Sequence, residues 1–219
     1  IITGPKSGPI LAVIDDLHYY QPSKIQCQAI PILNEQKKDL IAQAQSGSGK
    51  TVAYLISMLL HVDGEIHQPQ TICLFHTREI IKQTFDVFTK LNKYTKFVGD
   101  VCVKNTNDSE PPNKEAQLLF GTPASFTFWI KKGILDVSKV NFLVIDEADV
   151  ILDFDSTHYP PAANLMNKLL PPNVQYGFFS ATFKKEIIEF LKQKRPDIVT
   201  IRLRRNQQRV LTVDHWFTR

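Results

Sequence analysis

The sequence predicts an α/β domain built on a mostly parallel β-sheet with helices on both faces. Short apolar runs alternate along the chain with longer helical patterns, which indicates repeated strand–helix units. The runs are continuously apolar, as is typical of strands buried on both faces between crossover helices. Polar clusters directly follow five of these runs. Ligands of such sheets bind beyond the carboxyl ends of the strands.

The first half of the chain is predicted to alternate helix and strand from residue 10 onward. Residues 1–9 contain two Gly-Pro pairs and are expected to form a loop. The string Tyr19-Tyr20-Gln21-Pro22 breaks a first short helix, and Ser23 is a favourable N-cap for the second. Apolar runs predict the strands. The expected helices are 10–17, 24–33, 49–61 and 76–91, and the expected strands are 39–43, 71–75 and 97–103.

The second half repeats the same alternation after a polar loop. Residues 105–115 include two adjacent prolines and are expected to be exposed. The most apolar run of the chain follows and predicts a central strand. The expected strands are 117–120, 140–145, 175–179 and 197–203, and the expected helices are 123–131, 161–170 and 184–193. The domain is therefore placed at residues 10–208, with 209–219 as the start of a linker.

Composition fits one such domain of 219 residues. The hydrophobic share of 43% is enough for a full core, and a net charge of +4 permits nucleic acid without requiring it. Cys27, Cys73 and Cys102 form no CxxC pair, so no zinc site or disulfide framework is indicated. Each cysteine lies in an apolar run and is predicted to be a small buried hydrophobe in a reducing compartment.

No signal peptide and no membrane-length apolar run is recognised in the sequence. We therefore expect a soluble, intracellular monomer with no membrane contact.

A glycine-rich string, AQSGSGKT at residues 44–51, lies between a predicted strand and a predicted helix. This is the context of a phosphate-binding loop. Gly47 and Gly49 let the backbone turn its N–H groups inward, and the helix adds the positive end of its dipole. Lys50 can reach the β and γ phosphates, and Thr51 can ligate Mg²⁺. The alternative is a flexible turn ahead of a helix.

Asp146 and Glu147 directly follow the most apolar predicted strand. An acidic residue at this point of a nucleotide site holds Mg²⁺, largely through water. The next residue, Glu147, is placed to orient or deprotonate a water aimed at the γ-phosphate. Alone, the pair could be a solvated acidic helix start. Together with the glycine-rich string, it predicts a magnesium–ATP site with Lys50, Asp146 and Glu147 as the catalytic residues.

The string Asp146-Glu147-Ala148-Asp149 resembles the signature of the DEAD-box RNA helicases. Other motifs of that family's first RecA-like domain occur in the expected order. They are PSKIQ at 22–26 (the Q motif), the glycine-rich string (motif I), TRE at 77–79 with His76 in place of a proline (motif Ia), Thr122-Pro123, and SAT at 180–182 (motif III). The resemblance spans about residues 10–203 and implies a RecA-like fold.

The resemblance implies roles around ATP. The amide of Gln26 would match the N6 and N7 edge of adenine, and the Gln21 backbone would accept from the amino group; a surface helix glutamine is the alternative for Gln26. The family stacks an aromatic on adenine at a position that falls near Ile1, where there is none. The implied nucleotide-binding residues are Gln21, Gln26, Gln45, Ser46, Gly47, Ser48, Gly49, Lys50 and Thr51, with Thr51 and Asp146 toward Mg²⁺.

The resemblance also implies an RNA face and its link to ATP. Ser180 and Thr182 would bond the acidic motif at Asp149; a strand-end turn that caps the helix at Lys184 is the other reading, and the two are compatible. The residues implied to face the RNA backbone are Thr77, Arg78, Glu79, Lys104, Thr122 and Pro123. Arg78 and Glu79 could instead pair with each other.

Two departures fall on the RNA face. A family Gly-Gly is absent where Lys104-Asn105-Thr106 stands, and Ala124-Ser125 replaces Gly-Arg after Thr122-Pro123. Either change removes close backbone approach or positive charge, so RNA binding is expected to differ from the family norm.

The resemblance further implies RNA-dependent ATP hydrolysis that remodels RNA or RNA–protein complexes. Several strings look closest to the mRNA-export branch at the nuclear pore, which implies a cytoplasmic or nuclear location and a regulatory protein partner. No second RecA-like domain or arginine-finger motif follows; Arg202, Arg204, Arg205 and Arg209 are interpreted as solvated or linker charges. We therefore expect an N-terminal domain, weakly active alone. An ATP-switched RNA clamp or protein-docking module is the alternative. A DNA helicase or P-loop kinase fits the motif set less well.

Overall fold

The computed structural model describes residues 7–104 and 110–203. Its centre is a seven-stranded sheet of order β3-β4-β2-β5-β6-β1-β7, in which every strand pairing is parallel. The strands are β1 (Leu40–Gln43), β2 (Thr71–Leu74), β3 (Gly99–Cys102), β4 (Leu118–Gly121), β5 (Phe142–Asp146), β6 (Gln175–Ser180) and β7 (Val199–Arg202). The predicted α/β class and parallel sheet are confirmed.

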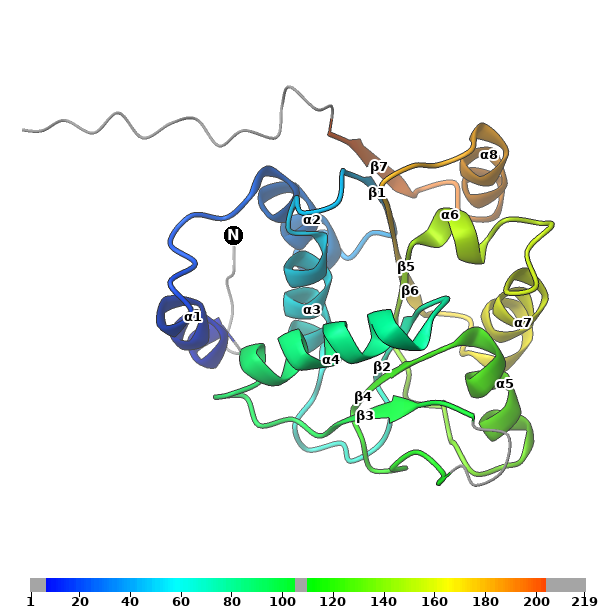
Figure 1. The fold of residues 1–219 in the computed structure, drawn as a ribbon, viewed down its shortest axis with the longest axis horizontal. Helices are drawn as coiled ribbons and strands as arrows, with labels where there is room; N and C mark the ends of the chain where they lie inside the picture. Colours follow the sequence, from blue (N-terminus) through cyan, green and yellow to red (C-terminus); the bar gives the residue numbers. More distant parts are fainter. Residues whose placement is uncertain (1–6, 105–109, 204–219) are drawn as a thin grey trace, which may run out of the picture.

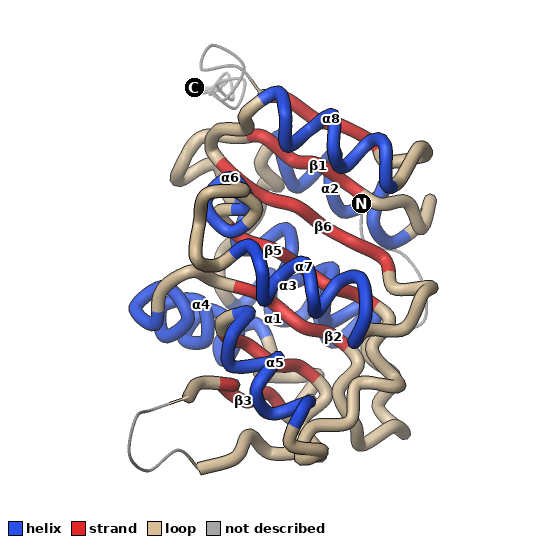
Figure 2. Tube along the Cα trace, turned by 90° about the vertical axis from the view of Figure 1, so that its right-hand side faces the viewer, coloured by secondary structure: helices blue, strands red, loops and turns tan. Residues whose placement is uncertain are grey.

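Helices cover both faces of this sheet (Figures 1 and 2). One layer holds α1 (Ser7–Asp16), α2 (Lys24–Asn34), α3 (Lys50–His61) and α4 (Arg78–Leu91). The other holds α5 (Pro123–Lys131), α6 (Ala148–Ile151), α7 (Tyr159–Asn164) and α8 (Lys185–Lys194). A π-helical turn, η1 (Leu165–Leu169), continues α7. Each strand found was predicted within a few residues of its observed bounds.

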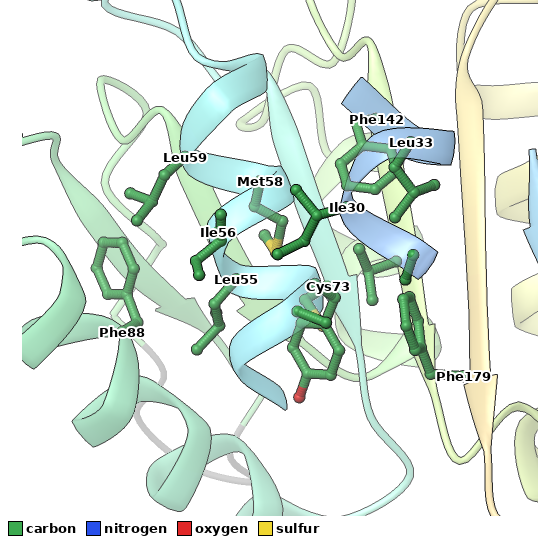
Figure 3. Packing of buried hydrophobic residues seen from close by; sticks show 14 of the residues in the cluster. Ile30, Leu33, Leu55, Ile56, Met58, Leu59, Cys73, Phe88, Phe142 and Phe179 are labelled. Carbon is green, nitrogen blue, oxygen red and sulfur yellow. The ribbon is translucent and has the colours of Figure 1, made fainter. Parts of the chain in front are cut away.

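Two hydrophobic cores explain why the strands are continuously apolar. Successive residues of one strand point to opposite faces, so Leu143 packs in one core and its neighbour Val144 in the other. Figure 3 shows part of the core on the α3 side, which includes Leu55 and Met58 of α3, Cys73 of β2 and Phe179 of β6.

Three sequence predictions are corrected by the fold. Residues 1–9 were expected to be a loop, but α1 begins at Ser7 and includes Gly8 and Pro9. Proline is tolerated in a first helical turn, because its missing N–H would have no helical partner there. Cys27 is exposed on α2, whereas Cys73 and Cys102 are buried as predicted. The expected helix 161–170 is divided between α7 and η1. The expected linker, 209–219, lies outside the described residues.

The sheet order brings the five polar clusters together. The strands that precede them are β4, β2, β5, β6 and β1, which are consecutive in the sheet. Because all of these strands are parallel, their carboxyl ends lie along one edge. The prediction that these clusters share one rim of the molecule is therefore confirmed.

Candidate nucleotide and RNA site

The glycine-rich loop, residues 44–51, links β1 to α3. Gly47 and Gly49 have positive φ angles of 76° and 94°, the left-handed region that favours glycine. A Cβ on Gly49 would lie 2.7 Å from Nε2 of Gln26 and 2.8 Å from Oγ of Ser23, whereas one on Gly47 would meet nothing within 4 Å. Glycine is thus required at position 47 because of its backbone conformation. At position 49 it is required because of the backbone conformation and because a side chain would clash with Gln26 and Ser23.

Lys50 opens α3 and folds back over its own loop. Its Nζ donates to the carbonyl oxygens of Ala44 and Gln45, the latter at 3.0 Å. Partial burial lowers the pKa of Lys50, and the nearby carboxylates of Asp146, Glu147 and Asp149 oppose that shift. The ammonium group therefore faces three acidic side chains across the loop.

Asp146 is the last residue of β5 and is only 9% exposed. Its carboxylate accepts hydrogen bonds from the Tyr54 hydroxyl at 2.9 Å and from the Glu147 N–H at 3.0 Å. Burial raises the Asp146 pKa, and the Tyr54 hydrogen bond is the largest opposing influence. Tyr54 was not singled out from the sequence, because nothing in the helical pattern of α3 separates it from an ordinary core residue.

Glu147 occupies the turn between β5 and α6. Its φ of 47° and ψ of 50° place this non-glycine residue in the left-handed region. Its side chain is 46% exposed. The turn thus aims a partly hydrated carboxylate beyond the carboxyl edge of the sheet, next to the buried carboxylate of Asp146.

One cavity unites the two halves of the predicted site. It has a volume of about 610 Å³, within the usual range of ligand pockets. Its walls carry the predicted phosphate-binding and acidic residues together: Ser46, Gly47, Gly49, Lys50, Thr51, Asp146, Glu147, Asp149 and Ser180. The expectation that the glycine loop and the acidic pair meet at one rim is confirmed.

A second cavity of about 630 Å³ adjoins the loop on the α2 side. It is lined by Gln21, Gln26 and the residues Gly47–Gly49, together with Tyr19 and Tyr20. Gln26 accepts from the Ser23 N–H at 2.9 Å and donates to the Gly49 carbonyl at 3.2 Å. Its amide therefore ties α2 to the glycine loop. From the sequence, Tyr19 and Tyr20 were interpreted only as part of the string that breaks the first helix. Two adjacent aromatic residues just before Pro22 could have indicated that they line a binding cavity.

The residues expected to link ATP to RNA, namely Asp149, Ser180 and Thr182, are directly hydrogen-bonded to one another. Asp149 accepts from the hydroxyls of Ser180 and Thr182, each at 2.5 Å. The strand-end turn is also present, since the Ser180 hydroxyl accepts from the Thr182 N–H at 3.2 Å, but it does not cap the next helix, because the N-cap residue of α8 is Lys184. The acidic turn after β5 and the end of β6 therefore form one hydrogen-bonded unit.

The residues predicted to face RNA lie at the ends of β2, β3 and β4. Arg78 donates to the Lys104 carbonyl at 2.6 Å, and in the described part of the chain it forms no ion pair with Glu79. Thr122 caps α5, with Pro123 in the first turn. Ser125 is buried; its Oγ accepts from the Lys104 N–H at 3.1 Å and lies 2.9 Å from the Thr122 hydroxyl.

A magnesium nucleotide suits these residues on structural grounds. The cavity is lined by Gly47 and Gly49, which carry no side chains; Lys50 supplies a cation to it, and Asp146 supplies a carboxylate. Within residues 7–104 and 110–203, no three His, Cys, Asp or Glu side chains cluster as a protein-only metal cage. Such a site suits Mg²⁺, which keeps most of its water and is held by few carboxylates.

Fold and site together define a RecA-like α/β domain with a phosphate-binding loop. The sequence profile of the DEAD/DEAH box helicases matches residues 23–190. The chain is 36% identical over 200 residues to the ATP-dependent RNA helicase ddx19 of Dictyostelium discoideum, covering 91% of this chain and 42% of that protein. The chain belongs to the DEAD/DEAH box helicase family.

Solved structures agree with this assignment. S. cerevisiae Dbp5 bound to RNA and ADP BeF3 matches with a TM-score of 0.81 and 31% identity, over 93% of this chain and 51% of that one. A variant of the same protein bound to Nup159, a Gle1 variant, IP6 and ADP matches with a TM-score of 0.79 and 32% identity, over 90% and 52%. The chain thus spans about half of these structures, and less than half of the curated relative.

The described residues contain no helix that is both long and apolar enough to cross a membrane.

Proposed function

We propose that this chain is the ATP-binding domain of an ATP-dependent RNA helicase of the mRNA-export type. The observation that carries the proposal is the shared cavity, where Lys50, Thr51, Asp146 and Glu147 converge. The relatives named DBP5 and ddx19 support RNA as the substrate, since they are named ATP-dependent RNA helicases.

Each residue of the cavity has a distinct task in this proposal. Lys50 would leave the Ala44 and Gln45 carbonyls and place its charge against the β and γ phosphates. Thr51 and Asp146 would hold Mg²⁺, which when bound neutralises phosphate charge. Glu147 would orient the attacking water and accept its proton. Gln26 would turn its amide from Ser23 and Gly49 toward the adenine edge.

The RNA side of the site is proposed to respond to ATP through Asp149. Its bonds to Ser180 and Thr182 connect the acidic turn to the end of β6. The RNA backbone would lie along Thr77, Arg78, Glu79, Lys104, Thr122 and Pro123. These groups offer hydroxyls, helix N-termini and charge, which contact phosphates without reading sequence.

A second RecA-like domain is proposed to complete the site from the same protein. It would supply the arginines that stabilise γ-phosphate charge, so this domain alone would hydrolyse ATP slowly. The Dbp5 structure with Nup159 and Gle1 supports a regulatory protein partner and action in the cytoplasm or nucleus, at the nuclear pore.

RNA-stimulated ATPase activity tests the proposal. We expect the protein, with all domains that its gene encodes, to hydrolyse ATP faster when RNA is added. Lys50→Ala should lose nucleotide binding, whereas Glu147→Gln should keep binding and lose hydrolysis. Glu186→Gln, on the exposed surface of α8, is the matched control and should behave as wild type. Hydrolysis that is indifferent to RNA would overturn the proposal.

An RNA clamp with little unwinding is a second candidate that one observation favours. Ser125 stands where the family motif has arginine, and its hydroxyl bonds Lys104 and Thr122 inside the fold instead of facing RNA. A clamp would retain RNA with a non-hydrolysable ATP analogue yet fail to separate a short duplex. Strand separation at a rate matching ATP turnover would exclude it.

A further inference from the structure

His76 lies beside the carboxylate of Glu147. It follows β2 by two residues, at the position where the family motif Pro-Thr-Arg-Glu has proline. Its Nδ1 is 3.1 Å from Oε2 of Glu147, and its side chain is only 19% exposed. The two groups come from neighbouring strands, β2 and β5, whose carboxyl ends are adjacent.

The Nδ1 atom of His76 has no other partner in the described residues. It is buried, and even its approach to Glu147 lacks hydrogen-bond geometry as placed. A buried donor without an acceptor is costly, and a small rotation of either side chain would satisfy it. Because Glu147 Oε2 is already 3.1 Å away, the acceptor that this nitrogen can reach with little movement is that carboxylate.

Glu147 needs such a contact because its backbone does not fix its side chain. The residue occupies a left-handed turn, and its carboxylate is nearly half exposed. Among the described residues, His76 is the one cationic or imidazole side chain within ion-pair distance of it. Proline at position 76 would offer neither a side-chain N–H group nor a backbone N–H group.

The ring of His158 packs against the ring of His76. The two rings meet edge to face, with centroids 6.2 Å apart and planes at 76°. Burial and the neighbouring His76 both lower the pKa of His158, so that ring stays neutral near pH 7. The imidazole of His76 therefore neighbours both the ring of His158 and the carboxylate of Glu147.

We infer that His76 is a positioning residue for Glu147. It donates from Nδ1 to Oε2 and leaves Oε1 facing the cavity, where the attacking water is oriented. The inference rests on the proposed function. It predicts that this chain fixes its general base through a histidine that the family motif lacks.

Two substitutions at one position separate positioning from packing. His76→Leu removes the donor, whereas His76→Asn keeps an N–H group near the place of Nδ1. Loss of one such hydrogen bond corresponds to roughly tenfold in rate. We expect His76→Leu to lower kcat of RNA-stimulated hydrolysis about tenfold with an unchanged KM for ATP, and His76→Asn to stay within about threefold of wild type. His67→Leu, at an exposed histidine, is the matched control.

A double variant tests whether the effect passes through Glu147. In a Glu147→Ala background, measured by single-turnover hydrolysis, His76→Leu should cause no further loss, because the group it positions is gone. A purely structural role would reduce the residual rate again. If His76→Leu does not fold, His76→Gln replaces it, since its amide lies near the place of Nε2 and should not support Glu147.

The outcomes distinguish this inference from the proposed function. A wild-type protein without RNA-stimulated hydrolysis overturns the proposed function. An active wild type with His76→Leu within threefold of it, or with His76→Asn as impaired as His76→Leu, overturns the role of His76 alone. A raised KM with unchanged kcat would also overturn it, because it would show that His76 serves nucleotide binding.

Discussion

Removal of the Tyr54 hydroxyl should lower the free energy of unfolding, because it removes a hydrogen bond to the buried carboxylate of Asp146. Tyr54 is fully buried, and its ring meets Phe179 edge to face at 5.3 Å. Tyr54→Phe keeps that ring and opens no cavity, so it removes chiefly the hydrogen bond to Asp146 at 2.9 Å. Hydrogen bonds to charged groups contribute about 1.5–3 kcal/mol. We expect a loss of about 2 kcal/mol, or roughly 4–8 °C in Tm for a chain of this size.

The loss should depend on pH in a defined direction. The Tyr54 bond lowers the Asp146 pKa against the effect of burial, so the Phe variant raises that pKa further. A raised pKa in the folded state means that ionised Asp146 opposes folding above that pKa. The deficit of the variant should therefore be largest above the folded-state pKa of Asp146 and should shrink as pH falls through that pKa.

Urea unfolding at pH 7 and a double-mutant cycle measure the effect. In an Asp146→Asn background, Tyr54 bonds a neutral amide, and its loss should cost only about 0.5–1.5 kcal/mol. Ser57→Ala is the control for a neutral buried hydrogen bond, because that fully buried hydroxyl donates to the Ala53 carbonyl at 3.0 Å. Equal losses in the wild-type and Asp146→Asn backgrounds would refute the reasoning.

Three further substitutions probe the loop, the metal-side carboxylate and the sheet. Gly49→Ala should weaken ADP binding more than Gly47→Ala in a thermal-shift titration, because only the former Cβ meets Gln26; equal effects would contradict the steric account. Asp146→Asn should raise the unfolding free energy at pH 7 yet abolish magnesium-dependent ATP turnover, since burial raises that carboxyl's pKa; a destabilised variant would count against it. Asp39→Ala should cost about 2–3 kcal/mol in urea unfolding, because it removes the ion pair with Arg195 at 2.9 Å and the acceptor of the Tyr176 N–H at 2.7 Å; a loss below 1 kcal/mol would show that these contacts are solvated.

The sheet and its functional edge could be predicted because the signal is local. Each strand is a short apolar run, and each polar cluster follows its strand directly, so parallel pairing alone places the clusters together. Motif spacing then identified Lys50 and Asp146, which the fold brings to one cavity. No knowledge of side-chain packing was needed for these conclusions.

The remaining contacts depend on packing that the sequence does not encode locally. Tyr54 and Asp146 are 92 positions apart, and the pattern of α3 marks Tyr54 only as a core residue. His76 was visible as a departure from a motif, but its partner is set by the adjacency of β2 and β5. The start of α1 was missed because Gly-Pro indicates a turn in general but is also compatible with a first helical turn.

The place of β1 in the sheet has a consequence for biosynthesis. This strand carries the glycine-rich loop, yet it pairs with β6 and β7, the last two strands of the described chain. A ribosome that has just made residues 40–51 has therefore not yet supplied either neighbour of β1. At about 5–20 residues per second, β7 follows roughly 7–30 s later. A nascent chain that stops before residue 199 would lack β7, so one side of the strand that carries the loop stays unpaired until translation of this domain is nearly finished.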